Sequence, residues 1–239
     1  MKKASEMLCV ALDTPSMKEA ISLVGRLDDG AGYVKVGLEL FTISGSRIVI
    51  ELLELGLKVF LDLKLHDIPN TVSGAVRGAA GLGVSLLTLH ASGGPEMIRA
   101  ARRAAEEAAP EERPRLLAVT VLTSLNAKLL EDTFGVAMEP AELALRLARM
   151  AKNSGADGVV CSPREAAAIR EECGKEFMIV TPGIRPEGSE TADQKRITTP
   201  ADAILAGSDL LVVGRPITKA PDPAAAAKNI LQSIEKAMK

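Results

Sequence analysis

The chain has very few aromatic residues: it lacks tryptophan and contains one tyrosine and four phenylalanines among 239 residues. Proteins that hold single-stranded nucleic acid stack successive bases on aromatic side chains. The scarcity of such side chains therefore argues against a base-stacking surface.

Cysteine and histidine are scarce as well. The three cysteines, Cys9, Cys161 and Cys173, form no CxxC pair, and the two histidines, His66 and His90, form no HxH or HExxH arrangement. An odd number of cysteines without metal-type spacing indicates reduced, structural thiols rather than a disulfide framework or a zinc site. We expect no metal ion, and we expect both histidines to be structural or to support neighbouring groups.

The sequence also lacks an excess of one charge and any long apolar run. Lys and Arg number 29 and Asp and Glu number 31, and this net charge of -2 is too small for a protein built to hold a nucleic-acid backbone or an anionic membrane. No apolar run approaches the roughly 18 residues of a membrane span, and residues 1–13 hold no stretch long enough for a signal peptide. We expect a cytoplasmic protein without nucleic-acid or membrane partners.

Short runs of β-branched residues and leucine alternate along the chain with longer segments of helical periodicity. Because eight such pairs fill the sequence without a linker or a change of composition, the pattern predicts an α/β fold, a single (β/α)8 TIM barrel domain over residues 1–239. The predicted strands are 7–13, 33–37, 58–65, 85–90, 116–123, 158–161, 178–181 and 209–214. The predicted helices are 16–27, 44–55, 71–82, 95–108, 141–154, 164–172, 201–206 and 224–238.

Charged residues stand where three of the predicted strands end, which in a barrel of this kind is the end that carries chemistry. The period of two places Asp62 and Lys64 on one face of their strand and the neighbouring leucines on the other, and it turns Lys35 and Asp13 inward too. A lysine between carboxylates stays protonated and is a good proton donor, which favours protonation of a carbanion. The alternative is an ion-pair array that only fixes the fold.

The last two predicted strands each run into a glycine beside an arginine. Thr181–Arg185 contains Pro182, Gly183 and Arg185, and Val213–Pro216 contains Gly214 and Arg215, so both loops offer close backbone approach and a forked donor for phosphate oxygens. Barrels often bind phosphate at these two loops. The polar stretch 186–199, with Gln194 inside it, is a candidate lid.

A third loop, after the fifth predicted strand, carries neutral hydrogen-bonding groups. Thr120, Thr123, Ser124 and Asn126 suit a polar, uncharged part of a ligand such as a heterocyclic base. Turn and capping residues have the same composition, so the pattern also allows a purely structural interpretation.

The stretch Asp62–Thr71, DLKLHDIPNT, resembles the signature of the orotidine 5'-phosphate decarboxylase family, and its D-x-K-x-x-D spacing is the most specific part. The resemblance covers nearly the whole chain. Further matching segments are Ala11–Asp13, Val34–Gly37, Leu122–Leu125, Thr181–Arg185, Asp193–Gln194 and Val213–Pro216.

This resemblance implies the decarboxylation of orotidine 5'-monophosphate to uridine 5'-monophosphate, the last step of pyrimidine synthesis, without a metal or organic cofactor. It implies that Lys64 protonates C6 of the pyrimidine while Asp62 lies beside the departing carboxylate, and that Lys35 and Asp67 complete the charged array around Lys64. It also implies a homodimer, in which Asp67 and Thr71 reach into the neighbouring subunit's site.

The remaining roles that the resemblance implies concern the substrate. Asp13 and Lys35 would contact the ribose, Thr123 and Ser124 the base. Arg185, Gln194, Gly214 and Arg215 would contact the phosphate and the closing loop. The expected substrate-binding set is Asp13, Lys35, Asp62, Asp67, Ile68, Thr71, Thr123, Ser124, Pro182, Arg185, Gln194, Gly214 and Arg215.

Two other functions compete with this one. Keto-gulonate phosphate decarboxylases and hexulose phosphate synthases share the D-x-K-x-x-D strand but use Mg²⁺ to stabilise an enediolate, and they lack the I-P-N-T continuation present here. A non-catalytic nucleotide-binding barrel is the second alternative, although a pure binder does not need a buried lysine between acids.

Overall fold

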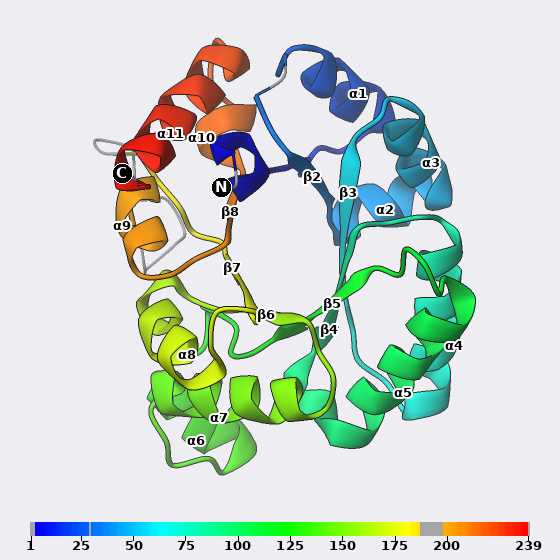
Figure 1. Cartoon of the computed structure of the whole chain (residues 1–239), viewed down its shortest axis with the longest axis vertical. Coiled ribbons are helices and arrows are strands. Elements are labelled where there is room, and N and C mark those ends of the chain that lie inside the picture. Colours follow the sequence, from blue (N-terminus) through cyan, green and yellow to red (C-terminus); the bar gives the residue numbers. More distant parts are fainter. Residues whose placement is uncertain (1–2, 29, 187–197, 239) are drawn as a thin grey trace.

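The computed structural model describes residues 3–28, 30–186 and 198–238, which form a closed barrel of eight parallel strands in sequence order (Figure 1). Each strand pairs with its neighbour in sequence, and β8 closes the ring against β1. The predicted (β/α)8 barrel is confirmed. The strands are β1 Leu8–Ala11, β2 Tyr33–Val36, β3 Lys58–Leu65, β4 Leu86–His90, β5 Arg115–Val119, β6 Gly158–Val160, β7 Met178–Thr181 and β8 Leu210–Val213.

Helices surround this ring on all sides (Figure 1). The α-helices are α1 Met17–Gly25, α2 Leu38–Ser44, α3 Ser46–Glu54, α4 Pro69–Gly81, α5 Gly94–Ala108, α6 Ala127–Phe134, α7 Pro140–Asn153, α8 Ala166–Cys173, α9 Pro200–Leu205, α10 Arg215–Thr218 and α11 Pro223–Ala237. Three short 3-10 helices complete the described chain, η1 Ala4–Met7, η2 Ala91–Gly93 and η3 Pro163–Glu165.

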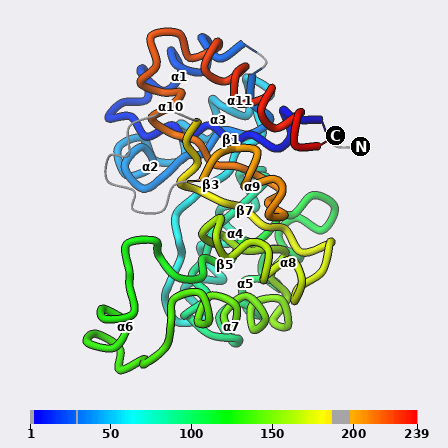
Figure 2. The backbone as a smooth tube through the Cα atoms, turned by 90° about the vertical axis from the view of Figure 1, so that its left-hand side faces the viewer, coloured from blue at the N-terminus to red at the C-terminus, as the bar shows by residue number. Residues whose placement is uncertain are grey.

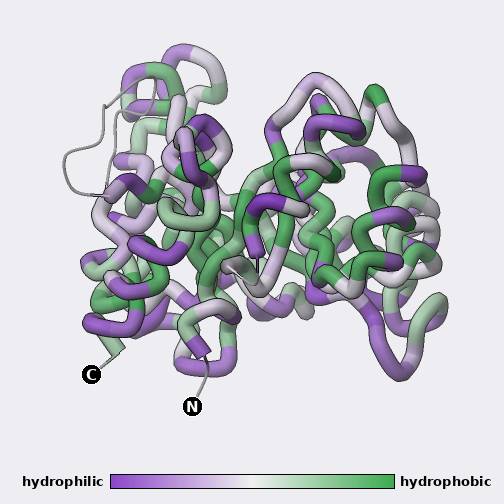
Figure 3. The backbone as a smooth tube through the Cα atoms, turned by 90° about the horizontal axis from the view of Figure 1, so that it is seen from above, coloured by the Kyte–Doolittle hydropathy of each residue, from purple (hydrophilic) through white to green (hydrophobic). Residues whose placement is uncertain are grey.

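The apolar side chains divide into two buried clusters, one on each face of the sheet. The larger cluster lies between strands and helices, and the smaller one fills the barrel with residues such as Cys9, Phe60 and Leu117. This division follows from the period of two along each strand, which sends alternate side chains to opposite faces. In Figure 3 the hydrophobic segments accordingly concentrate towards the centre and the hydrophilic ones towards the outside.

The predicted strands and long helices match the observed ones, with ends that differ by a few residues. Three α-helices were not predicted, namely α2, α6 and α10. The first strand ends at Ala11 rather than at position 13, and the fifth at Val119 rather than at 123. As a result Asp13 and Thr123 lie in loops beyond the strands.

The two ends of the barrel differ in what surrounds them. Figure 2 shows η1 and the end of α11 together on one side of the molecule and α6 projecting on the opposite side. Since α6 follows the carboxyl end of β5, the side that carries α6 is the end where the polar loops gather. Within the described part of the chain, no helix is both long and apolar enough to cross a bilayer.

Candidate active site

A cavity of about 490 Å³ opens at the carboxyl ends of the strands. Its walls come from every strand or following loop except those of β4, so the fold brings together residues far apart in the sequence. The lining residues are Ala11, Asp13, Lys35, Phe60, Asp62, Lys64, Val119, Val121, Leu122, Thr123, Val160, Cys161, Pro182, Gly183, Arg185, Val212, Gly214, Arg215, Thr218 and Lys219.

Four of these residues, Asp13, Lys35, Asp62 and Lys64, form a continuous chain of ion pairs that we call the charged array. The ammonium nitrogen of Lys35 lies 3.1 Å from Oδ1 of Asp13 and 3.5 Å from Oδ2 of Asp62. The same Asp62 oxygen accepts a hydrogen bond from the Lys64 ammonium at 2.8 Å. All four side chains face the cavity, as predicted, although strand alternation accounts only for Lys35 and Asp62, because Asp13 lies in a loop and Lys64 at an irregularity of β3.

The two innermost members of the array are buried as ions. Burial alone lowers the pKa of Lys35, but the nearby carboxylates of Asp62 and Asp13 outweigh it, and the net pKa is raised. Burial alone raises the pKa of the Asp62 carboxyl, but Lys35 and Lys64 outweigh it, and the net pKa is lowered. Both groups are thus held in their charged forms, as the expensive transfer of ions from water requires.

Glycine at position 37 makes room for the array. A Cβ on Gly37 would lie 2.9 Å from the Lys35 ammonium, which is too close, and 3.3 Å from Oδ1 of Asp13, which is a tight contact. Any larger residue there would displace the Lys35–Asp13 ion pair.

Lys64 has an unusual backbone. Its φ is 51°, a left-handed conformation that residues with a side chain rarely adopt, and the pairing of β3 with β4 shifts register between Leu61 and Leu65. The backbone N–H of Lys64 donates to the hydroxyl of Thr88. Strained backbone that the surroundings hold in place is typical of functional positions.

The two glycine–arginine loops follow the neighbouring strands β7 and β8 and line the same cavity, and Gly214 lies beside the charged array, 3.7 Å from Asp13 Oδ2 to the position that a Cβ would take. Gly183 has a φ of 81°, Arg185 is buried with its guanidinium donating to the Ile184 carbonyl, and Gly214 and Arg215 line the same cavity. The fold therefore brings the two predicted loops together, and their binding of a phosphate stays a prediction. Gln194 and residues 187–197 of the candidate lid lie outside the described residues.

The predicted neutral loop contributes less to the cavity than its composition suggested. Thr123 lines the cavity, whereas the exposed Ser124 does not. Asn126 caps α6 by accepting from the N–H of Leu129, and the hydroxyl of Thr120 donates to the Val160 carbonyl. These last two residues thus have the structural roles that the sequence also allowed.

Asp67, Ile68 and Thr71 do not reach the cavity of their own chain. All three are exposed, and Oδ1 of Asp67 accepts the backbone N–H of Ile68 at 2.6 Å. Ile68, 67% exposed, joins Leu38 and Ile43 of α2 among the large apolar side chains left in contact with solvent. Within one chain, Asp67 is therefore not part of the charged array.

The apolar half of the cavity was not predicted. Phe60, Val160 and Val212 belong to the cluster inside the barrel or pack against it, and Val121 and Leu122 extend the apolar surface over the loop after β5. The alternation along β3 could have predicted the position of Phe60, because residues two apart on a strand, such as Phe60 and Asp62, point to the same face. Lys219 at the end of α10 and Thr88 on β4 were also missed.

Among the described residues, no three His, Cys, Asp or Glu side chains gather as ligands for a metal ion. His66 and His90 lie beside each other with ring centroids 5.4 Å apart, outside the cavity lining. Burial, together with His66 and Lys64, lowers the pKa of His90.

Comparison with known proteins agrees with this geometry. Residues 6–230 match the model of the orotidine 5'-phosphate decarboxylase / HUMPS family. An orotidine 5'-phosphate decarboxylase of Moorella thermoacetica is 52% identical over 97% of this chain and 93% of its own length, and one of Vibrio parahaemolyticus is 52% identical over 96% and 97%. The crystal structure of the Lactobacillus acidophilus orotidine 5'-phosphate decarboxylase matches with a TM-score of 0.86 and 42% identity, covering 96% of this chain and 99% of that one. The chain therefore belongs to the orotidine 5'-phosphate decarboxylase / HUMPS family, as its motifs indicated.

Proposed function

We propose that this chain decarboxylates orotidine 5'-monophosphate to uridine 5'-monophosphate and CO2, the step that completes pyrimidine nucleotide synthesis. The observation that carries the proposal is the placement of Asp62 between two lysine ammonium groups in a cavity that Arg185 and Arg215 also line. Relatives at about half identity over nearly their full lengths are named for this reaction. The enzyme is then a carbon–carbon lyase.

Lys64 is the proposed proton donor. When the bond between C6 and the substrate carboxylate breaks, CO2 leaves and its electron pair stays on C6, where a proton from the Lys64 ammonium completes the product. Asp62 accepts a hydrogen bond from this ammonium at 2.8 Å, which holds the proton donor in place. The negative charge of Asp62 would also face the departing carboxylate, which disfavours the charged ground state.

The two arginines suit the phosphate of the nucleotide. Arg185 and Arg215 provide forked donors, while Gly183 and Gly214 keep the backbone accessible, and Pro182 and Thr123 border the space between phosphate and base. Binding energy from a phosphate that does not react can orient the reacting carbon over the charged array. Asp13 and Lys35 are the residues proposed to contact the ribose of the nucleotide.

The reaction is proposed to need no metal ion. Both carboxylates of the array already contact lysine ammonium groups, two at Asp62 and one at Asp13, and a divalent cation bound there would be repelled by these positive charges. This arrangement favours the decarboxylase over a Mg²⁺-dependent sugar-phosphate enzyme of the same family.

The deciding experiment follows loss of orotidine 5'-monophosphate by ultraviolet absorbance, with excess EDTA, for the wild type and Lys64→Ala. Conversion to uridine 5'-monophosphate that survives EDTA and disappears in the variant is the expected result. Conversion that only Mg²⁺ restores would support the sugar-phosphate class, and nucleotide binding without turnover would support a silent binding barrel.

The active form is proposed to be a homodimer with shared sites. Asp67 and Thr71 are exposed, lie outside their own cavity, and flank the exposed Ile68, which suits residues that complete a partner's site. Mixing inactive Lys64→Ala with inactive Asp67→Ala protein tests this. Random exchange of subunits would return about a quarter of wild-type activity, because half the dimers would contain one intact site of two. No recovery despite subunit exchange would contradict the sharing.

A cytoplasmic location remains a prediction.

A further inference from the structure

Strand β3 carries more residues than β4 beside the charged array. Leu61 pairs with Leu87 and Leu65 pairs with Leu89, so the three residues from Asp62 to Lys64 lie opposite the single residue Thr88. An irregularity of this kind leaves backbone groups of the longer strand without partners in the ladder. The Asp62–Lys64 ion pair is therefore built on a bulge, not on a regular strand.

The side chain of Thr88 supplies partners that the ladder does not. Its hydroxyl oxygen accepts the backbone N–H of Lys64 at 2.9 Å, and the hydroxyl donates to Oδ1 of Asp62 at 2.9 Å. One hydroxyl can do both, because it has one proton and two lone pairs. Thr88 is completely buried, and a β-branched side chain has little rotational freedom, so this oxygen is fixed.

Each of the two hydrogen bonds constrains one half of the ion pair. The bond from the Lys64 N–H stabilises a backbone conformation that lysine rarely adopts, with φ at 51°. The bond to Asp62 holds one carboxylate oxygen, which leaves Oδ2 directed at the ammonium groups of Lys35 and Lys64. A single buried atom thus fixes both the origin of the lysine side chain and the rotation of the carboxylate.

We propose that Thr88 is a positioning residue, whose hydroxyl sets the distance and orientation between the Lys64 ammonium and the Asp62 carboxylate. Thr88 does not line the cavity, so it acts through these two residues and not on the substrate. Its kinetic consequence rests on the proposed decarboxylase function. Since it affects the reacting groups and not the arginines proposed to bind the phosphate, its loss should lower kcat more than it raises KM.

The test compares Thr88→Val, which keeps the shape and removes the hydroxyl, with Thr88→Ser, which keeps the hydroxyl. Because a misplacement of about 1 Å can cost on the order of 100-fold in rate, we expect kcat to fall about 10- to 100-fold in Thr88→Val, KM to change less than about threefold, and Thr88→Ser to restore most of kcat. Ser154→Ala is the matched control. It also removes a buried hydroxyl, which donates to the Met150 carbonyl far from the array, and it should leave kcat unchanged.

A second readout does not depend on activity. The groups that act on Asp62 are Lys35 from β2, Lys64 from β3 and Thr88 from β4, with Cys9 of β1 and His90 of β4 also within electrostatic reach. Because the Thr88 hydroxyl stabilises the ionised carboxylate, its removal should raise the pKa of Asp62. Carbon-13 NMR of aspartate-labelled protein, assigned with Asp62→Asn, measures this pKa in Thr88→Val, Thr88→Ser and the wild type.

The outcomes separate the two proposals. Wild-type protein that does not decarboxylate overturns the proposed function, while the pKa of Asp62 still decides the role of Thr88. A Thr88→Val enzyme with wild-type kcat and an unshifted Asp62 pKa overturns the positioning role, as does a Thr88→Ser enzyme equally impaired. If Thr88→Val does not fold, Thr88→Cys, with a weakly hydrogen-bonding thiol, replaces it, and undiminished kcat in that variant would also refute the role.

Discussion

The two ends of the barrel both carry aspartates paired with cations, yet they use different cations. At the amino ends of the strands, Asp157 accepts hydrogen bonds from Arg102 and Arg113, and Asp209 accepts from Arg170. At the carboxyl ends, the cations that pair with Asp62 and Asp13 are lysines. The same carboxylate chemistry thus has a different partner on each side of the molecule.

The difference follows from what each pair does. Asp157 also accepts the N–H of Leu116 in β5, and Asp209 accepts the N–H of Ile179 in β7, so each arginine-bound carboxylate ties neighbouring strands together. An arginine fork holds a carboxylate firmly but cannot release its proton. A lysine holds it less rigidly and can transfer a proton. The arginine end fixes the barrel, whereas the lysine end leaves a group that can react.

Replacing Lys64 by arginine tests this contrast most severely. The charge and the contact with Asp62 remain, but the transferable proton is lost, so kcat should fall about 100- to 10,000-fold, the range attributed to general acid catalysis. Steady-state kinetics and urea unfolding together measure it. Stability should change little, and Lys58→Arg, at the exposed start of the same strand, should leave kcat unchanged. Activity of Lys64→Arg within about tenfold of the wild type would argue against proton transfer from Lys64.

Replacing Asp157 by alanine should have the reverse effect, a loss of stability with an unchanged kcat. Two guanidinium groups and the N–H of Leu116 would lose their acceptor, which we expect to cost about 2–3 kcal/mol of unfolding free energy, less than for a fully buried pair because the site is partly exposed. Urea unfolding gives this value, and kcat at a temperature where the variant is folded should equal that of the wild type. A loss of kcat in the folded variant would show that the two ends are coupled.

The pH dependence of stability tests whether the Asp62 carboxyl is held in its charged form. Its pKa in the folded chain is lowered, so its contribution to stability is complete above the unfolded value of about 3.9 and is lost as the pH falls through the folded pKa. The difference in unfolding free energy between wild type and Asp62→Asn should therefore be constant near neutral pH. As the pH drops below about 4, the wild type should lose unfolding free energy relative to Asp62→Asn. A difference independent of pH down to 3 or so would contradict a lowered pKa.

The smallest effect is expected for Arg113→Lys. The charge beside Asp157 is kept, but two parallel hydrogen bonds of 2.7 Å become at most one, which should cost about 1 kcal/mol in urea unfolding. An unchanged stability would mean that charge alone, and not the fork, holds the strands.

Much of this organisation could be predicted from the sequence because it depends on periodicity. Alternation along β2 and β3 was enough to turn Lys35 and Asp62 inward, and glycine beside arginine marked two loops that line the cavity. Helix α6 was predictable in principle, since Asn126 and Gly135 are ordinary start and stop residues, but the polar loop was interpreted as a ligand contact.

Other features depend on three-dimensional contacts that no local pattern encodes. Nothing in the composition of β3 distinguishes the left-handed backbone of Lys64 from a regular strand residue. The bulge becomes visible only when β4 is placed alongside, and the role of Thr88 becomes visible with it. Helix α2 was missed because it is short and separated from α3 by Gly45 alone.

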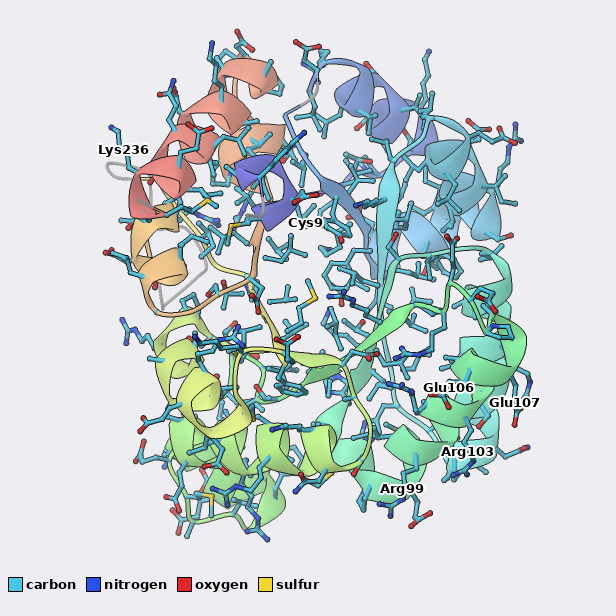
Figure 4. The ribbon with its side chains drawn as sticks, in the orientation of Figure 1. Cys9, Arg99, Arg103, Glu106, Glu107 and Lys236 are labelled. Carbon is cyan, nitrogen blue, oxygen red and sulfur yellow. The ribbon has the colours of Figure 1, made fainter. Side chains whose placement is uncertain are left out.

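The three cysteines have a practical consequence. Cys9 lies inside the ring of strands (Figure 4), and Cys161 and Cys173 are also almost completely shielded from solvent, whereas charged residues of α5 such as Arg103 and Glu107 extend outwards. Burial raises the pKa of each thiol, so the reactive thiolate is suppressed while the barrel is closed. Cys161 lines the active-site cavity and Cys173 lies on α8, whereas Cys9 belongs to the cluster inside the barrel. The rate at which a thiol reagent modifies Cys9 in native buffer therefore measures how often the barrel opens.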